Sequence, residues 1–208
     1  MIIAIDGPAA SGKGTLGKRI AAHYGLAHLD TGKLYRAVAR DTLALGAQPS
    51  DACAALEAAK ALDPNTLDDP ALIDGKLGKA ASIVASQPEV RKALLDYQRA
   101  FAGRKPGAVL DGRDIGTVVC PEAKAKLFIT ATPEIRARRR HEELIGRGAD
   151  SIYARVLEDM MERDQRDASR KVAPSRPAPD ALVLDTSTLG ANEVFEKALA
   201  FVKERCGL

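Results

Sequence analysis

The chain has 208 residues, of which 46% are apolar and 28% charged, and its formal net charge is +3. This length and composition predict a globular domain with a hydrophobic core of its own. Aromatic residues make up only 4% and tryptophan is absent, so stacking platforms for single-stranded nucleic acid are not expected. Three dispersed cysteines predict neither a disulfide framework nor a zinc site.

The chain begins with a strand-like apolar run and shows no basic leader, and no apolar stretch reaches the length of a membrane helix. We therefore expect a cytoplasmic protein that binds neither membranes nor nucleic acid. No long apolar seam indicates an obligate oligomer, so a monomer is the expectation.

The N-terminal half begins with an unbroken apolar run over residues 1–5, which predicts a buried parallel strand. A glycine-rich loop follows, then a helical pattern over 16–24 and a short strand candidate over 27–29. Residues 63–74 read as a polar loop, and no alternating strand pattern occurs between 50 and 105. Further helices are expected over 32–45, 51–62, 77–85 and 88–101.

Strands and helices alternate again after residue 105. Strands are expected over 107–111, 126–130 and 181–185, and helices over 132–147, 152–170 and 191–205. This order predicts an α/β fold, with a five-stranded, mainly parallel sheet covered by helices on both faces. We expect a single domain with a core of about 1–30 and 106–208, and an insertion-like subdomain over about 31–105.

The loop after the first strand, GPAASGKGT, has the spacing of a phosphate-binding loop (P-loop). Its glycines let successive backbone N–H groups point at one anion, and the next helix adds the positive end of its dipole. Lys13 supplies a full charge for the β- and γ-phosphates, and the Thr15 hydroxyl can reach a phosphate or the Mg²⁺ shell. The sequence thus predicts a phosphotransferase that uses a nucleoside triphosphate. The nucleotide-binding residues are Gly7, Pro8, Ala9, Ala10, Ser11, Gly12, Lys13, Gly14 and Thr15.

Two further groups of charged residues accompany this loop. Arg113 and Asp114 follow a buried strand, and a parallel sheet places such residues on the rim where ligands bind. Arg163, Asp167 and Arg170 are spaced by 4 and 3 residues, so they share one face of a helix. Fixed guanidiniums stabilise the charge that phosphoryl transfer spreads over the moving group.

Seven segments extend these motifs over most of the chain: GPAASGKGT, LDTGKLYRAVA, KAASIVASQPEVRKAL, QRAF, DGRDIGTVVCP, ERDQRDASR and DALVLDTSTL. Together they resemble the bacterial cytidylate kinases, a branch of the nucleoside-monophosphate kinases. The placement of Gly14 between Lys13 and Thr15 is also more similar to that branch than to GTPases or motor ATPases. The resemblance implies a P-loop NTPase-type fold, and transfer of the γ-phosphoryl group of ATP, with Mg²⁺, directly to CMP or dCMP.

The resemblance also implies roles for the matching residues. Catalysis would fall to Lys13, Arg113 and Arg170. Arginines around 136–155 would form a lid over the transferred phosphoryl group, with a lid region of about 138–170, and the insertion over about 31–105 would bind the nucleoside monophosphate. A carboxylate at Asp114 would accept from the cytosine amino group and repel the carbonyl of uracil. The CMP phosphate would be held by Arg36, Arg113 and Arg170 beside Thr31 and Tyr35, the sugar by Arg163 and Asp167, and the base by Ser82, Arg91 and Asp114.

The segment before KAAS departs from the family, which has a longer, strand-containing insertion there. Residues 63–78 are short and rich in proline and aspartate, so the preference between CMP and dCMP stays open. Two alternatives also stay open. One is a P-loop kinase for another small acceptor, such as UMP or a metabolite alcohol. The other is a nucleotide sensor or RNA-binding regulator without turnover, against which the low aromatic content and modest charge count.

Overall fold

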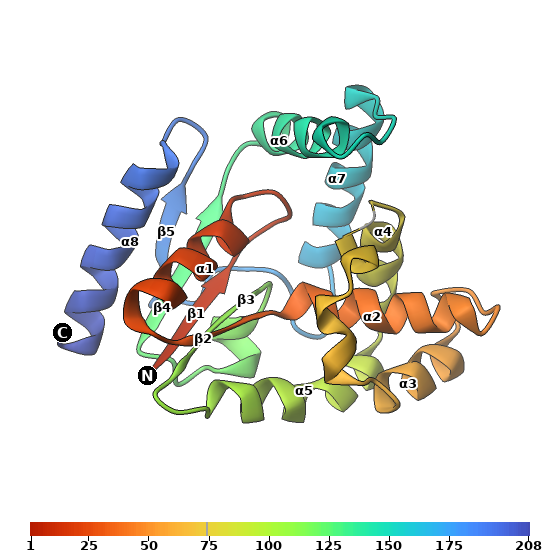
Figure 1. Ribbon diagram of the computed structural model, residues 1–208, viewed down its shortest axis with the longest axis horizontal. Coiled ribbons are helices and arrows are strands. Elements are labelled where there is room, and N and C mark those ends of the chain that lie inside the picture. The colour runs from red at the N-terminus through yellow and green to blue at the C-terminus, as the bar shows by residue number, and fades with distance from the viewer. Residues whose placement is uncertain (74) are drawn as a thin grey trace. The chain divides into compact units, whose positions relative to one another are not determined.

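The computed structural model describes residues 1–73 and 75–208. They form two compact units, Met1–Leu29 with Ala100–Leu208, and Asp30–Arg99. A five-stranded sheet in the order β2-β3-β1-β4-β5 organises the first unit (Figure 1). Strand β1 pairs in parallel with β3 and β4, and β4 with β5, which confirms the predicted sheet. The strands are β1 (Ile2–Asp6), β2 (Ala27–Asp30), β3 (Ala108–Gly112), β4 (Ala125–Thr130) and β5 (Leu182–Asp185).

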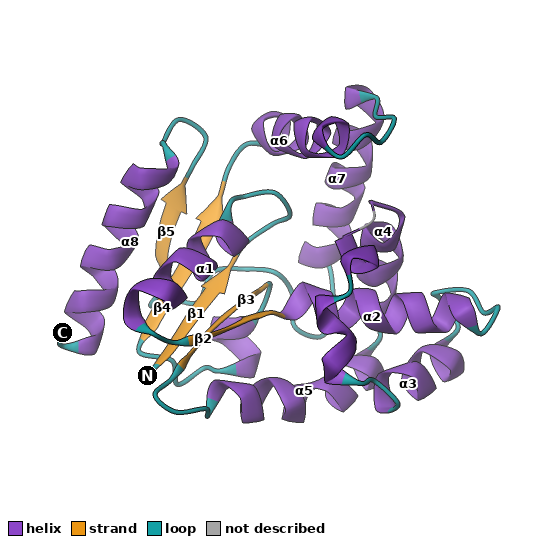
Figure 2. Ribbon diagram, in the orientation of Figure 1, coloured by secondary structure: helices purple, strands orange, loops and turns teal. Residues whose placement is uncertain are grey.

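One face of this sheet shares an apolar core with two helices. Side chains alternate along β1, so that Ile3 and Ile5 pack with Leu16, Ile20 and Val194 from the two helices. Burying each such large aliphatic side chain contributes about 1.5–3 kcal/mol. Figure 2 shows α1 (Lys13–Tyr24) and α8 (Ala191–Cys206) beside the strands. The unit also contains α6 (Pro133–Gly146) and α7 (Tyr153–Ala168).

A π-helical turn at Ile115–Val119 follows β3 and was not predicted. Two hydrogen bonds with π-helical spacing define it, from Val119 N to Asp114 O at 3.2 Å and from Cys120 N to Ile115 O at 2.7 Å. The turn contacts β1 and β3. It therefore holds the start of the DGRDIGTVV segment against the carboxyl ends of two central strands.

The second unit is helical. Its predicted helices are confirmed, and no strand lies within residues 31–73 or 75–99. The segment predicted as a loop over 63–74 instead contains two short 3₁₀ helices, Pro64–Asp68 and Pro70–Ile73, while residue 74 lies outside the described residues. The helices are α2 (Thr31–Ala44), α3 (Ala52–Lys60), α4 (Gly75–Val84) and α5 (Pro88–Ala102), the last of which runs into the first unit.

Two basic side chains of α2 bond to the short segment before α4, Lys33 to Asp68 at 3.0 Å and Arg40 to two further residues. Arg40 donates from Nη1 to Asp69 at 3.0 Å and from Nη2 to Thr66 at 3.3 Å. At the start of α2, the Asp30 side chain accepts from Gly32 N at 2.9 Å, which caps the helix. Among the described helices, none combines the length and apolar character that crossing a bilayer requires.

Candidate functional site

The P-loop joins β1 to α1 and depends on residues that tolerate positive φ angles. Gly7 has φ 147° and Gly12 has φ 95°, and Ala10 adopts 56° between them. A Cβ atom on Gly7 would lie 2.0 Å from the backbone oxygen of Ile129, so no other residue fits there without moving the backbone. The loop therefore starts in close contact with β4, and this contact explains the first glycine of the motif.

The polar side chains of the loop lie near the start of α1. Lys13 donates from Nζ to Pro8 O at 3.4 Å, which places its ammonium group across the loop. Thr15 is exposed, so its hydroxyl is accessible. The far side of the loop is anchored, because Thr186 donates from Oγ1 to Ser11 O at 3.0 Å. This geometry suits a loop that binds phosphate with its lysine and backbone amides.

Asp167 gathers the three arginines that were predicted to share a site with it. Arg113 donates from Nε to Asp167 Oδ2 at 3.0 Å, and Arg163 Nε lies 3.9 Å from the same oxygen. Arg170 pairs with the other oxygen, Oδ1. Burial works to raise the pKa of Asp167, but Arg113, Arg170 and Arg163 together outweigh it and hold that pKa below the ordinary 3.8. Asp167 is therefore a permanent anion that brings three cations together.

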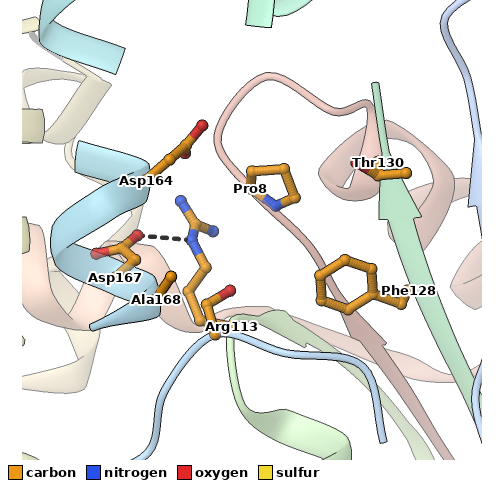
Figure 3. A pocket seen from close by; sticks show the side chains of 8 residues that line it. Pro8, Arg113, Phe128, Thr130, Asp164, Asp167 and Ala168 are labelled. Carbon is orange, nitrogen blue, oxygen red and sulfur yellow. Dashed lines mark hydrogen bonds and ion pairs between the residues drawn. The ribbon is translucent and has the colours of Figure 1, made fainter. Parts of the chain in front are cut away.

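A pocket of about 200 Å³ lies beside this cluster. Figure 3 shows the Arg113 guanidinium between the acids of α7 and Pro8 of the P-loop. A fixed guanidinium next to a phosphate-binding loop is suited to hold a second anion at short range. The pocket is lined by Pro8, Arg113, Phe128, Thr130, Asp164, Asp167, Ala168 and Ser175.

The carboxylates around β3 differ in their surroundings. Asp114 is buried, with 5% of its surface exposed, and immediately precedes the π-helical turn. Asp111 Oδ2 lies 2.9 Å from Nε2 of His28. A Cβ atom on Gly17 of α1 would lie 2.9 Å from the same His28 nitrogen, so a glycine is needed where α1 passes over this pair. Asp111 and His28 thus join β2, β3 and α1 below the P-loop.

Asp6, at the end of β1, was missed by the reasoning from sequence. It is 3% exposed and accepts hydrogen bonds from Ile115 N at 2.7 Å and Gly116 N at 2.8 Å. Burial raises the pKa of Asp6 to about 7, the two amides oppose the rise, and the charge of Asp114 adds to it. Asp6 could have been found from its position in the sequence, because it is an acid directly after an apolar strand and directly before the first P-loop glycine.

Arg136 belongs to a row of arginines that was expected around the transferred group, but its guanidinium is buried. It donates from Nε to Ala131 O at 2.9 Å and from Nη1 to Ala9 O at 3.3 Å. Its Nη2 lies 2.6 Å from Asp164 Oδ2. Arg136 therefore braces the P-loop against α6 and α7, which spacing alone did not reveal.

In the second unit, four of the five predicted site residues are buried. These are Thr31, Tyr35, Ser82 and Arg91. The Arg91 guanidinium lies 5.5 Å from the Tyr35 ring centroid and donates from Nη1 to Ala85 O at 3.3 Å. The fifth, Arg36, is partly exposed, with Nη1 3.9 Å from Asp30 Oδ2. The unit thus holds Tyr35 and Arg91 in contact as a cationic and aromatic pair.

A magnesium ion would find few protein ligands here. Within residues 1–73 and 75–208, no group of three or more His, Cys, Asp or Glu side chains could hold a metal. Mg²⁺ in nucleotide sites usually keeps several waters and binds substrate phosphates with one or two protein oxygens. The accessible hydroxyl of Thr15 fits that mode of binding.

Solved structures with the same fold include an uncharacterized protein from Eubacterium ventriosum and a gluconokinase from Sinorhizobium meliloti. The first has a TM-score of 0.59 at 14% identity, covering 99% of both chains. The second has a TM-score of 0.52 at 15% identity, covering 97% of this chain and 91% of the other. These similarities extend the shared α/β fold over nearly the whole chain.

Sequence comparison goes further than fold. The cytidylate kinase of Xanthobacter autotrophicus is 60% identical over 205 residues, 99% of this chain and 98% of the relative. That of Azorhizobium caulinodans is 59% identical over 207 residues, covering 100% of each. The family model described as cytidylate kinase matches residues 3–204. The chain belongs to the cytidylate kinase family.

Proposed function

We propose that the protein transfers the γ-phosphoryl group of ATP to the phosphate of CMP or dCMP, giving CDP or dCDP. The observation that carries the proposal is the group of arginines on Asp167, beside the pocket that Pro8 of the P-loop also lines. Such a group supplies fixed positive charge for an acceptor phosphate next to the donor loop. The match to the cytidylate kinase family supports CMP as that acceptor.

Each charged group then has a task in the transfer. Lys13 and the loop amides bind the donor phosphates, while Arg113 and Arg170 bind the acceptor phosphate. Mg²⁺, when bound, neutralises phosphate charge, and Thr15 would be its protein ligand. No general base is required, because a nucleoside monophosphate has a second pKa of about 6 and is mostly ionised at neutral pH.

Recognition of cytosine is proposed for Asp114, Ser82 and Arg91, each by its own side-chain chemistry. Asp114 would accept from the amino group of cytosine, and its charge would repel the carbonyl that uracil carries at that position. In the second unit, Ser82 and Arg91 are both buried, which suits readout of a base by hydrogen bonds. Arg163 and Asp167 would contact the sugar.

An acceptor panel tests the proposal. Release of ADP from ATP is measured with CMP, dCMP, UMP, AMP and shikimate, and we expect CMP or dCMP to give the highest kcat/KM. A faster reaction with UMP or with the non-nucleotide acceptor would support the alternative kinase instead. ATP binding without transfer to any monophosphate would support a nucleotide sensor. Lys13→Ala is the matched control, because it removes the charge proposed to bind the donor phosphates and should lose turnover without losing the fold.

A further inference from the structure

Asp6 occupies a position that connects two parts of the proposed site. It is the last residue of β1 and directly precedes Gly7 of the P-loop. Because side chains alternate along a strand, it points to the face of the sheet opposite the core face of Ile5. The side chain is almost completely buried, yet the transfer as described above makes no use of it.

The partners of Asp6 are the first two amides of the π-helical turn. Ile115 N and Gly116 N donate to Oδ1 and Oδ2 at 2.7 and 2.8 Å. Amides at the start of a helical turn have no acceptor within the turn and require a cap. Asp114, which stands at the capping position, makes no side-chain cap bond. Asp6 therefore caps this turn from a distant point of the chain.

The turn has little room to find another arrangement. A Cβ atom on Gly116 would lie 3.2 Å from Cδ of Lys126 and 3.4 Å from Oδ2 of Asp6. The glycine thus allows the turn to approach the carboxylate closely. Because each carboxyl oxygen accepts from a different amide, the side chain fixes both the position and the orientation of the turn.

We propose that Asp6 is a positioning residue for phosphoryl transfer: its carboxyl group holds the turn that follows Arg113 and Asp114 at a fixed distance from the P-loop. Gly7 follows Asp6 in the chain, so the donor loop and the acceptor-binding arginine are joined through one side chain. This role rests on the proposed function. In reactions that depend on alignment, a displacement of about 1 Å costs on the order of 100-fold in rate.

The test compares Asp6→Asn with Ile5→Val. The second substitution destabilises the core at the preceding residue but leaves intact the two hydrogen bonds from Ile115 N and Gly116 N to Asp6, here called the Asp6 clamp. Asn keeps one acceptor oxygen but turns an amino group toward an amide donor. We expect Asp6→Asn to lower kcat/KM for CMP by about tenfold or more, with KM for ATP changed less than twofold. Ile5→Val should lower the melting temperature and leave both constants unchanged.

A second variant and a second measurement keep the test decisive. Gly116→Ala retains Asp6 but pushes the turn away from Lys126, so it should reproduce the kinetic effect if Asp6→Asn fails to fold. Amide hydrogen exchange at Ile115 and Gly116 should accelerate in Asp6→Asn and not in Ile5→Val.

Two results would overturn the proposal. One is a lower melting temperature of Asp6→Asn with kcat/KM for CMP within twofold of wild type, which would leave Asp6 with a structural role only. The other is unchanged exchange at the two amides. A wild-type protein that fails to phosphorylate CMP would refute the proposed function instead. Hydrogen exchange would still measure how firmly the Asp6 clamp protects the two amides.

Discussion

Asp6 and Asp167 are two buried carboxyl groups of the same unit, each 3% exposed, but different partners hold them. Asp6 is bound by two neutral amides, whereas Asp167 is bound by guanidinium groups. Burial acts to raise both pKa values, yet that of Asp6 rises to about 7 and that of Asp167 falls below 3.8. The two amide dipoles at Asp6 do not offset the effect of burial on its pKa, whereas the full charges of the arginines at Asp167 do.

The difference separates two ways of building a phosphate site. Asp167 stays ionised throughout the physiological range, so the arginines around it keep their positions before an anion arrives. Asp6 stands close to its midpoint at neutral pH, and its contribution is geometric rather than electrostatic.

Replacing Asp167 with Asn should have the largest consequence, because it leaves three cations without their common counterion. Removing one partner of a buried ion pair costs about 3–5 kcal/mol, so we expect a loss of this order in the free energy of unfolding. The kcat/KM for CMP should fall on the order of 100-fold or more, since the arginines that we propose to bind the acceptor would lose their alignment. Urea unfolding and the coupled ADP assay measure the two effects.

A matched control for that variant is Glu158→Gln, which removes an exposed negative charge from the same helix. It should change stability by less than about 0.5 kcal/mol. Equal effects of the two substitutions would show that net charge on α7 matters, rather than the arginine cluster.

Replacing Asp6 with Asn should cost less stability than replacing Asp167. The native group already carries a proton for part of the time near neutral pH, so an uncharged side chain of the same shape resembles one of its natural states. We expect a loss of about 1–2 kcal/mol, the cost of one imperfect buried hydrogen bond. A loss as large as that of Asp167→Asn, measured in the same urea series, would contradict the contrast.

The pH dependence of stability should have opposite signs for the two groups. The folded pKa of Asp6 is above the unfolded value of 3.8, so folding takes up a proton between about pH 4 and 7, and stability falls as pH rises through that window. The folded pKa of Asp167 is lowered, so its contribution is present above 3.8 and is lost as pH falls through the lowered value. The difference in unfolding free energy between wild type and each single variant, measured across pH, isolates each contribution. A wild type that gains stability relative to Asp6→Asn between about pH 4 and 7 would reverse the assignment for Asp6.

The smallest effect is expected for Asp114→Ala, on the pH range over which the titration of Asp6 changes the free energy of unfolding. Removing a nearby negative charge should lower the pKa of Asp6, so the loss of stability with rising pH should end at a lower pH than in wild type. The same variant should also weaken CMP and reduce the preference for CMP over UMP. An unchanged CMP/UMP ratio in the acceptor assay would remove Asp114 from base recognition, whatever happens to the pH window.

The sheet, most helices and the family were predictable from the sequence because they depend on local patterns. An apolar strand, a glycine loop and a helix over residues 1–24 are contiguous, and so is DGRDIGTVV. The spacing correctly placed Arg163 and Asp167 on one face of α7, but the helix ends at Ala168, so Arg170 lies beyond it and not on that face. Arg170 still pairs with Asp167, as Arg113 does from another segment.

The parts that could not be predicted depend on contacts between distant segments. The cap on Ile115 comes from Asp6, which is 109 residues away in the chain. Arg136 lies in a run of arginines, and the sequence does not show which of them is buried. Only the fold shows that Arg136 donates to the backbone of Ala9. The roles of the individual site residues, the division into core, insertion and lid, and the monomeric state stay predictions.

The two P-loop glycines with positive φ should differ in how they tolerate substitution. At Gly7 a side chain would meet the Ile129 carbonyl, a rigid part of the sheet, whereas at Gly12 a Cβ atom would have no described atom within 4 Å beyond the glycine and its two chain neighbours. Only backbone preference disfavours other residues at Gly12, so asparagine, which adopts left-handed conformations more readily, is the substitution that fits best there. In a saturation library selected for folding, position 7 would thus return a single amino acid, while position 12 would also accept asparagine.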